Sequence, residues 1–154
     1  MVSEIRIAAR ALVVVLLLAG GGLALRAEAA PPSQPRYGMA MREAWIPLPD
    51  GVRLAADLYV PTGAKPGQRF PVLLEYLPYR KTEARGRNWP LYSYFVERGY
   101  IVARVDIRGT GNSEGTLIPY EYSDIELDDG EQVIGWLARQ PWSTGAIGMF
   151  GISW

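Results

Sequence analysis

The 154-residue sequence contains neither histidine nor cysteine, and these two absences exclude several kinds of site. Without cysteine the chain has no disulfide and no thiolate ligand for a metal ion. Without histidine it lacks the usual base that makes a serine hydroxyl nucleophilic near neutral pH, so it does not encode a complete Ser-His-Asp triad. Basic and acidic residues balance at 16 each, and no basic run indicates a surface for nucleic acid.

The first 29 residues have the pattern of a signal peptide. Arg6 and Arg10 precede an uncharged apolar run over residues 11–25, and residues 27–29 provide a small-x-small cleavage sequence. The apolar run is shorter than the roughly 20 residues that a membrane span requires. We therefore predict cleavage after Ala29 and a secreted or periplasmic protein without a membrane attachment, whereas the alternative is an uncleaved anchor. Cleavage removes three arginines and two glutamates and leaves a net charge of about −1.

The full 154-residue sequence has 49% hydrophobic and 21% charged residues, as globular domains do. Residues 30–41 are rich in proline and are predicted to form an extended linker. Residues 42–154 are predicted to form the N-terminal part of one domain. In this part an Asp-Gly turn at 50–51 joins two strands, and residues 52–60 alternate with a period of two. This alternation predicts a half-buried strand in an antiparallel hairpin at a sheet edge.

Strands and helices alternate after the hairpin. Apolar runs predict three buried strands over residues 70–76, 100–105 and 146–150. Helices are predicted over residues 89–98 and 123–139. This order predicts an α/β fold with a mostly parallel sheet, whose ligands bind at the carboxyl ends of the strands.

Each predicted helix carries specific expectations about its surface and its ends. The helix over 89–98 is expected to end at Gly99 and to carry Leu91, Tyr94 and Phe95 on one side. The helix over 123–139 is expected to begin with a Ser-x-x-Glu capping box. Its apolar side comprises Val133, Ile134 and Leu137, and its solvated acidic face comprises Asp128, Asp129 and Glu131.

The last four residues, 151–154, read Gly-Ile-Ser-Trp and resemble the first half of a nucleophile elbow. In a Gly-x-Ser-x-Gly turn after a buried strand, glycines are expected because a side chain there would collide with its neighbours. We therefore predict that Ser153 is a nucleophile and that the backbone N–H of Trp154 stabilises an oxyanion. The alternatives are an ordinary turn and a tryptophan that packs in the core. The second glycine would follow Trp154, so we expect the domain to be truncated at the elbow.

Two other segments follow predicted strands. Tyr79 comes directly after Pro78, and its hydroxyl could donate to an oxyanion or the ring could simply pack. The glycines of residues 106–115 do not have the spacing of a dinucleotide-binding or phosphate-binding loop. We therefore predict that Asp106 and Arg108 fix this loop by an ion pair or by carboxylate–backbone bonds, and a catalytic role is the alternative.

Carboxylates are frequent in residues 124–129, but their spacing is not that of a calcium-binding loop. We interpret them as the surface of a helix. The sequence therefore predicts neither a cofactor nor a metal ion.

Three ordered motifs, in residues 49–59, 106–115 and 142–154, resemble the X-Pro dipeptidyl-peptidase and cocaine-esterase (CocE/NonD) family of serine hydrolases. The resemblance extends over residues 42–154. It implies an α/β-hydrolase fold in an incomplete form. Members of that family are several times longer, with a helical cap and a carboxyl-terminal jelly-roll-like domain.

The same resemblance implies roles for particular residues. Ser153 corresponds to the nucleophile, and Tyr79, within a Pro-Tyr-x-Lys segment, corresponds to the tyrosine that supplies a hydroxyl to the oxyanion hole. The backbone N–H of Trp154 would be the second donor. The aspartate and histidine of the triad follow the nucleophile in α/β-hydrolases, so neither would lie in these 154 residues.

We therefore predict the amino-terminal fragment of an exported serine hydrolase that cleaves an ester or amide by acyl transfer and is inactive on its own. Its substrate would be a small molecule or a peptide, and peptide, β-lactam-type amide and simple ester all remain open. The alternatives are a non-catalytic binding module with the same fold and an anchored envelope protein. A self-sufficient small domain would leave one apolar face of its last strand exposed.

Overall fold

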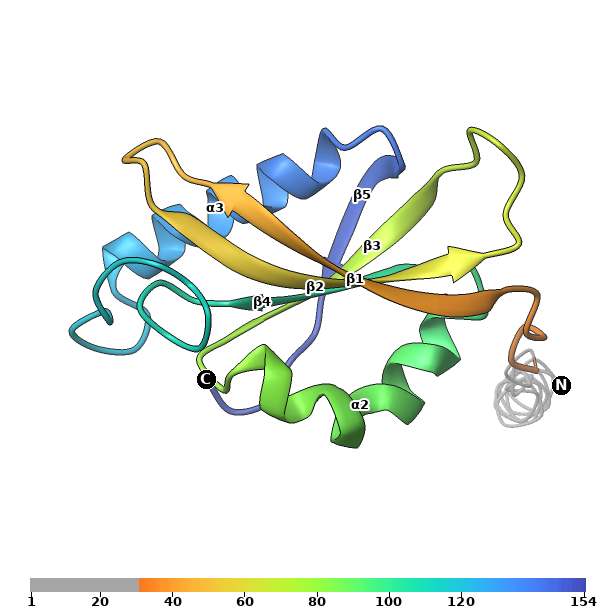
Figure 1. Ribbon diagram of the computed structural model, residues 1–154, viewed down its shortest axis with the longest axis horizontal. Coiled ribbons are helices and arrows are strands. Elements are labelled where there is room, and N and C mark those ends of the chain that lie inside the picture. The colour runs from red at the N-terminus through yellow and green to blue at the C-terminus, as the bar shows by residue number, and fades with distance from the viewer. Residues whose placement is uncertain (1–30) are drawn as a thin grey trace, which may run out of the picture. The chain divides into compact units, whose positions relative to one another are not determined.

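The computed structural model describes residues 31–154, so the predicted signal peptide lies outside the described residues (Figure 1). The elements in chain order are β1 (Gly38–Pro47), β2 (Arg53–Thr62), β3 (Phe70–Leu77), α2 (Lys81–Val96), β4 (Ile101–Asp106), α3 (Asp124–Ala138) and β5 (Ser143–Met149). β1 thus begins inside the predicted linker. Neither of the helices in this part of the chain is long and apolar enough to cross a membrane.

The five strands form one sheet in the order β1-β2-β4-β3-β5. β2 is antiparallel to both of its neighbours, β1 and β4, whereas β3 is parallel to β4 and to β5. Only β2 therefore runs against the common direction, which confirms the predicted mostly parallel sheet with an antiparallel hairpin. Since β3, β4 and β5 point the same way, the segments that follow them meet at one edge of the sheet.

α2 and α3 cover opposite faces of this sheet (Figure 1). The face under α3 is aliphatic, and Val133 and Leu137 of that helix are fully buried against it. The main apolar side chains that the strands contribute to this core are Leu54, Ala56, Leu58, Val72, Leu74, Ile101, Ala103 and Val105. The face under α2 has a smaller apolar cluster of Tyr59, Tyr92, Val96 and Val102.

Ion pairs fill the rest of the interface between α2 and the sheet. Asp57 is fully buried and accepts hydrogen bonds from Lys81 Nζ at 2.8 Å and from Arg85 Nε at 2.7 Å. Burial alone would raise the pKa of Asp57, but these two cations outweigh it and hold the pKa below its usual value. Beside them Arg104 Nη1 pairs with Glu75 at 2.8 Å, and both side chains are buried. α2 is therefore attached to the sheet by the ion pairs of Lys81 and Arg85 with Asp57 as well as by its apolar cluster.

The antiparallel hairpin lies at an edge of the sheet as predicted, with β1 as the edge strand and β2 between β1 and β4. However, β2 is buried on both faces, so the prediction that this strand is half-buried was wrong. Residues 54–59 are all buried, including the polar position Asp57. The polar position in the alternating pattern, Asp57, does not face solvent, because it forms ion pairs beneath α2.

α2 begins at Lys81, eight residues before the predicted start at Trp89. Its first half is polar, so the apolar period that identifies helices is missing there. Of the residues predicted on its apolar side, Phe95 packs against the cluster under the helix. Leu91 and Tyr94 do not, since they are 46% and 43% exposed, and Tyr92 and Val96 are fully buried in their place.

α3 begins where predicted, but the capping box does not form. The Ser123 hydroxyl has no hydrogen-bond partner within residues 31–154. Glu126 instead accepts a hydrogen bond from the backbone N–H of Tyr122 at 2.8 Å. The expected solvated face is also interrupted, because Asp129 is buried.

β5 occupies the second edge of the sheet, since β3 is its only partner strand within residues 31–154. The strand was predicted to be buried, and this was wrong: most of its residues are exposed, and Met149 is 58% exposed. Apolar composition indicated a central strand, but the described part of the chain provides cover on one side only.

Candidate active site

Ser153 lies in a sharp turn just after β5. The Phe150 N–H still donates to the Leu74 carbonyl oxygen at 3.0 Å, so pairing with β3 continues to that point. Ser153 then has a φ of 68°, in the left-handed region that residues other than glycine seldom adopt. Its side chain is exposed at the carboxyl edge of the sheet. This strained, exposed corner is the geometry that a nucleophile elbow requires.

Gly151 does not occupy a crowded position, contrary to the expectation for an elbow glycine. A Cβ built on Gly151 would lie 3.6 Å from the nearest atom, Cδ2 of Leu77, which is an ordinary van der Waals contact. The reason that the sequence suggested for this glycine, a steric collision, is therefore wrong for the structure.

Tyr79 faces the elbow from the loop between β3 and α2. Its hydroxyl oxygen accepts a hydrogen bond from the backbone N–H of Trp154 at 3.4 Å, and its side chain is 40% exposed. A phenol that accepts one hydrogen bond can still donate its own proton to another oxygen. The structure thus brings Ser153, Tyr79 and Trp154 together, and their catalytic roles remain predictions.

Asp106, at the end of β4, fixes the corner that carries Tyr79. Its Oδ1 accepts the Lys81 N–H at 2.6 Å, and its Oδ2 accepts the Asn112 N–H at 3.0 Å. Gly111 has a φ of 51°, and a Cβ there would lie 2.0 Å from Asp106 Oδ2, so only glycine fits. Burial raises the pKa of Asp106, although both N–H groups oppose this. The predicted carboxylate–backbone bonding is confirmed.

Arg108 fixes the same loop from its other side. It donates to both carboxylate oxygens of Asp129, from Nε at 2.7 Å and Nη2 at 2.8 Å. Its Nη1 donates to Asp50 Oδ2 at 2.7 Å, and this bond lowers the pKa of Asp50. Arg108 therefore joins α3 to the β1–β2 turn and does not pair with Asp106. Its structural role as an ion-pairing residue is confirmed.

The glycines of this loop allow its backbone to approach neighbouring atoms closely. Gly109 N–H donates to the Glu114 carbonyl oxygen at 2.9 Å, so it is not available to a ligand. A Cβ on Gly109 would lie 2.1 Å from the backbone nitrogen of Leu117, because the chain folds back onto the loop. The loop is closed by contacts of its own backbone.

Two side chains that sequence reasoning did not assign to the site hold the elbow, one from α3 and one from the loop just before it. The Tyr122 hydroxyl donates to the carbonyl oxygen of Ser153 at 3.5 Å. The indole Nε1 of Trp154 donates to Glu126 Oε1 at 2.7 Å. Glu126 had been assigned to a capping box, and no pattern in the sequence distinguishes that role from a bond to Trp154.

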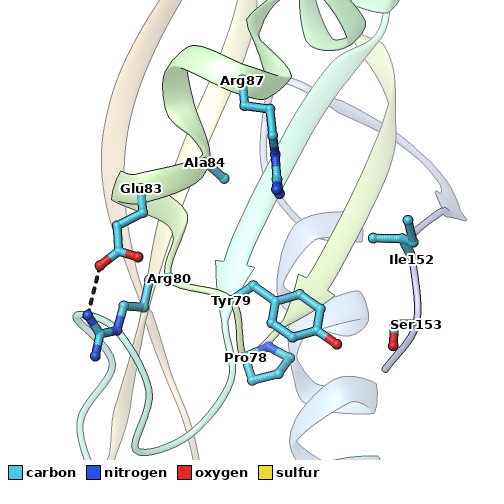
Figure 2. A pocket seen from close by; sticks show the side chains of 8 residues that line it. All are labelled: Pro78, Tyr79, Arg80, Glu83, Ala84, Arg87, Ile152 and Ser153. Carbon is cyan, nitrogen blue, oxygen red and sulfur yellow. Dashed lines mark hydrogen bonds and ion pairs between the residues drawn. The ribbon is translucent and has the colours of Figure 1, made fainter.

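A cavity of about 670 Å³ opens between the elbow and α2 (Figure 2). Arg80 at its rim pairs with Glu83 at 2.7 Å, and Arg87 extends from α2 toward the space between Tyr79 and Ile152. The lining residues are Pro78, Tyr79, Arg80, Glu83, Ala84, Arg87, Ile152 and Ser153. Ser153 also lines a smaller hollow of about 300 Å³ on the β5 side. Its hydroxyl is thus accessible from a space large enough for a small ligand.

The arrangement suits addition to a carbonyl group. A hydroxyl and two hydrogen-bond donors converge, which is what a tetrahedral oxyanion needs. No group of three potential metal ligands occurs in residues 31–154. The proton acceptor for Ser153 is not a histidine of this chain, because the sequence has none.

Known proteins match this chain in sequence and in structure. It is 39% identical over 114 residues to the cocaine esterase of a Rhodococcus species, covering 71% of this chain and 18% of that protein. A CocE/NonD family hydrolase from Staphylococcus aureus superposes with a TM-score of 0.59 at 29% identity, covering 72% of this chain and 22% of that one. An α-amino acid ester hydrolase superposes with a TM-score of 0.57 at 28% identity, covering 84% and 24%.

These matches confirm the α/β-hydrolase fold and the CocE/NonD resemblance. The chain spans about a fifth of the length of the curated relatives it matches. The model of the X-Pro dipeptidyl-peptidase (S15) family matches residues 50–154, from the hairpin turn to the elbow. The chain therefore belongs to the X-Pro dipeptidyl-peptidase (S15) family.

Proposed function

We propose that this chain contributes the nucleophile and the oxyanion hole of a serine hydrolase that cleaves an ester or amide by acyl transfer. One observation carries the proposal. Ser153 occupies a left-handed corner beside a cavity, and the two predicted oxyanion donors, Tyr79 Oη and Trp154 N, lie 3.4 Å apart next to it. Membership of the S15 family and the esterase and peptidase names of the relatives support it.

In the proposed reaction Ser153 Oγ attacks the carbonyl carbon of the substrate while a base removes the hydroxyl proton. The carbonyl oxygen becomes an oxyanion, which the Tyr79 hydroxyl and the Trp154 N–H stabilise. The C–O or C–N bond then breaks, and the leaving group takes the proton. Water releases the acyl group by the same steps in reverse, so the Ser153 hydroxyl is regenerated.

The base and its orienting carboxylate would come from outside residues 1–154. The sequence has no histidine, and the curated relatives are roughly three to four times as long as the chain. We propose that the active form contains a segment that supplies this pair. Without it the rate should fall by several orders of magnitude.

Active-site labelling of the protein expressed from its complete reading frame tests the proposal. A fluorophosphonate should label Ser153 covalently, and Ser153→Ala should lose both labelling and ester hydrolysis. Ser93→Ala is the matched control, because its hydroxyl bonds only to the Pro90 carbonyl oxygen on the surface of α2. Labelling of another residue, or full activity of Ser153→Ala, would contradict the assignment and favour the alternative of a non-catalytic binding module.

We also propose that the protein is exported after cleavage behind Ala29. The charge and apolar pattern of residues 1–29 supports this. Amino-terminal sequencing of the mature protein should begin at Ala30. An intact amino terminus in the membrane fraction would instead support the anchored envelope protein.

A further inference from the structure

The proposed reaction does not use Arg87, although this side chain extends into the cavity beside Tyr79 and Ile152 (Figure 2). Within residues 31–154 Arg87 forms no ion pair, and its one side-chain hydrogen bond is a 3.3 Å contact with its neighbour Asn88. The other arginine of the cavity, Arg80, is neutralised by Glu83 at 2.7 Å. Arg87 therefore provides an uncompensated positive charge at the cavity.

The chemistry of a guanidinium group narrows the ligands that this charge would bind. Its planar set of N–H donors matches the two oxygens of a carboxylate, which it can bind with two parallel hydrogen bonds. The lining has two arginines and one glutamate, so its net charge is +1. One free guanidinium balances a singly charged carboxylate, whereas a doubly charged phosphate would need a further cation.

We propose that Arg87 binds a carboxylate of the substrate, so that the preferred substrates are esters or amides that carry a carboxylate away from the scissile bond. This inference rests on the proposed function, since it uses the same cavity and Ser153. Arg87 projects from α2, on the opposite side of the cavity from the elbow (Figure 2). The carboxylate would therefore be separated from the reacting carbonyl by a spacer. Pro78, Ala84 and Ile152 contribute apolar side chains to the lining of this cavity.

Matched pairs of esters test the proposal with the protein expressed from its complete reading frame. For a carboxylate on the acyl side, p-nitrophenyl hydrogen adipate is compared with p-nitrophenyl methyl adipate. For a carboxylate on the leaving group, 4-acetoxybenzoate is compared with its methyl ester. Ser153→Ala provides the blank for spontaneous hydrolysis. In one of the two pairs kcat/KM should be about tenfold higher for the charged member, as expected for one charge-assisted contact at a partly solvated site.

Substitutions then assign the preference to one residue. Arg87→Gln should remove the preference by lowering kcat/KM for the charged ester about tenfold, with the neutral ester unchanged. Arg87→Lys should restore part of it, because the charge remains but the planar donor set does not. The double variant Arg80→Gln/Glu83→Gln is the control in the same cavity and should keep the preference, because it removes both members of the ion pair and leaves the net charge of the lining at +1.

A binding measurement gives a second readout that does not require turnover. Monomethyl adipate should bind the Ser153→Ala protein about tenfold more tightly than it binds the Ser153→Ala/Arg87→Gln protein in calorimetric titration. Dimethyl adipate should not distinguish the two proteins.

The outcomes separate this inference from the proposed function. If neutral esters are cleaved in a Ser153-dependent way without a preference for either charged ester, the inference is overturned and the proposed function stands. Loss of the preference in Arg80→Gln/Glu83→Gln but not in Arg87→Gln also overturns it. If the protein cleaves none of the four esters and binds the two adipates equally, both are overturned.

Discussion

The indole Nε1 of Trp154 donates a hydrogen bond to Glu126 Oε1 at 2.7 Å, and this bond ties the elbow to α3. The other carboxylate oxygen of Glu126 accepts the Tyr122 N–H. Glu126 is itself only 5% exposed. The buried Glu126 carboxylate therefore holds the side chain of Trp154, whose backbone N–H faces Tyr79.

Glu126→Ala should lower kcat about tenfold with little change in KM, because the Trp154 N–H is no longer held toward the oxyanion. Glu126→Gln keeps an acceptor oxygen and should retain most of the activity. Glu131→Ala, an exposed position on the same helix, is the control. Steady-state kinetics of the three variants check this, and equal losses in Glu126→Ala and Glu131→Ala would contradict a positioning role.

Tyr79→Phe should lower kcat about a hundredfold, since one oxyanion donor is lost while the ring remains. KM and the unfolding temperature should change little, because Tyr79 is 40% exposed and solvent can replace its bond to Trp154. Tyr120→Phe, at a side chain that is 66% exposed, should behave as the unmodified protein. Undiminished kcat in Tyr79→Phe would remove this residue from the site.

Asp106→Ala should destabilise the protein by about 2–4 kcal/mol, because it leaves the N–H groups of Lys81 and Asn112 without their acceptor. Urea denaturation measures this free energy of unfolding. Asp128→Ala, at an exposed carboxylate of α3, should change it by no more than about 0.5 kcal/mol. A loss in Asp106→Ala as small as in that control would show that the loop does not depend on the carboxylate.

The Asp57 ion pairs should make stability depend on pH in the acid range. The folded pKa of Asp57 lies below the unfolded value near 3.8, so its contribution is complete above that pH and is lost as the pH falls through the folded pKa. At pH 7, Asp57→Asn leaves the buried Lys81 with only its 3.4 Å contact to the exposed Glu43, so the variant should be about 3–5 kcal/mol less stable.

The difference between the two proteins should shrink as the pH falls below 3.8, since the unfolded chain then binds a proton at Asp57 that the folded protein does not bind as readily. Urea denaturation at each pH measures it. A difference that stays constant from pH 7 to pH 3 would contradict the lowered pKa.

The 154-residue chain by itself should react only slowly with a fluorophosphonate, because it contains no histidine to activate Ser153. The protein from the complete reading frame, labelled in parallel and analysed by mass spectrometry, is the comparison. Rapid stoichiometric labelling of Ser153 in the short chain would show that another group of the chain serves as the base.

The sequence predicted the order of strands and helices along the chain and placed the candidate site residues after the strands, because apolar runs and turn residues are local signals. It did not predict burial that depends on partners distant in the chain. The sequence pattern around Asp57 is that of a solvent-facing position, because Lys81 and Arg85, which pair with it, are distant in the chain. The start of α2 was missed for the same reason, since its first turns are held by charge and carry no apolar period.

In the candidate site, too, some residues could be predicted from the sequence and others could not. Ser153, Tyr79 and Trp154 could be selected from motifs and a family resemblance. Arg87 and Glu126 could not, because a charged residue on a helix has the same local pattern whether it meets solvent, a ligand or a neighbouring indole. Only the three-dimensional arrangement distinguishes these cases.

The ion pairs between α2 and the sheet constrain how the substrate specificity of this protein can change during evolution. A helix that packs on a purely apolar surface can slide along that surface by small steps, because one aliphatic contact replaces another. A slide of α2 by one turn, about 5.4 Å, would separate Lys81 and Arg85 from Asp57 altogether. The wall of the cavity that α2 forms is therefore locked in register, and new specificities should arise by exchanging its side chains rather than by shifting its backbone.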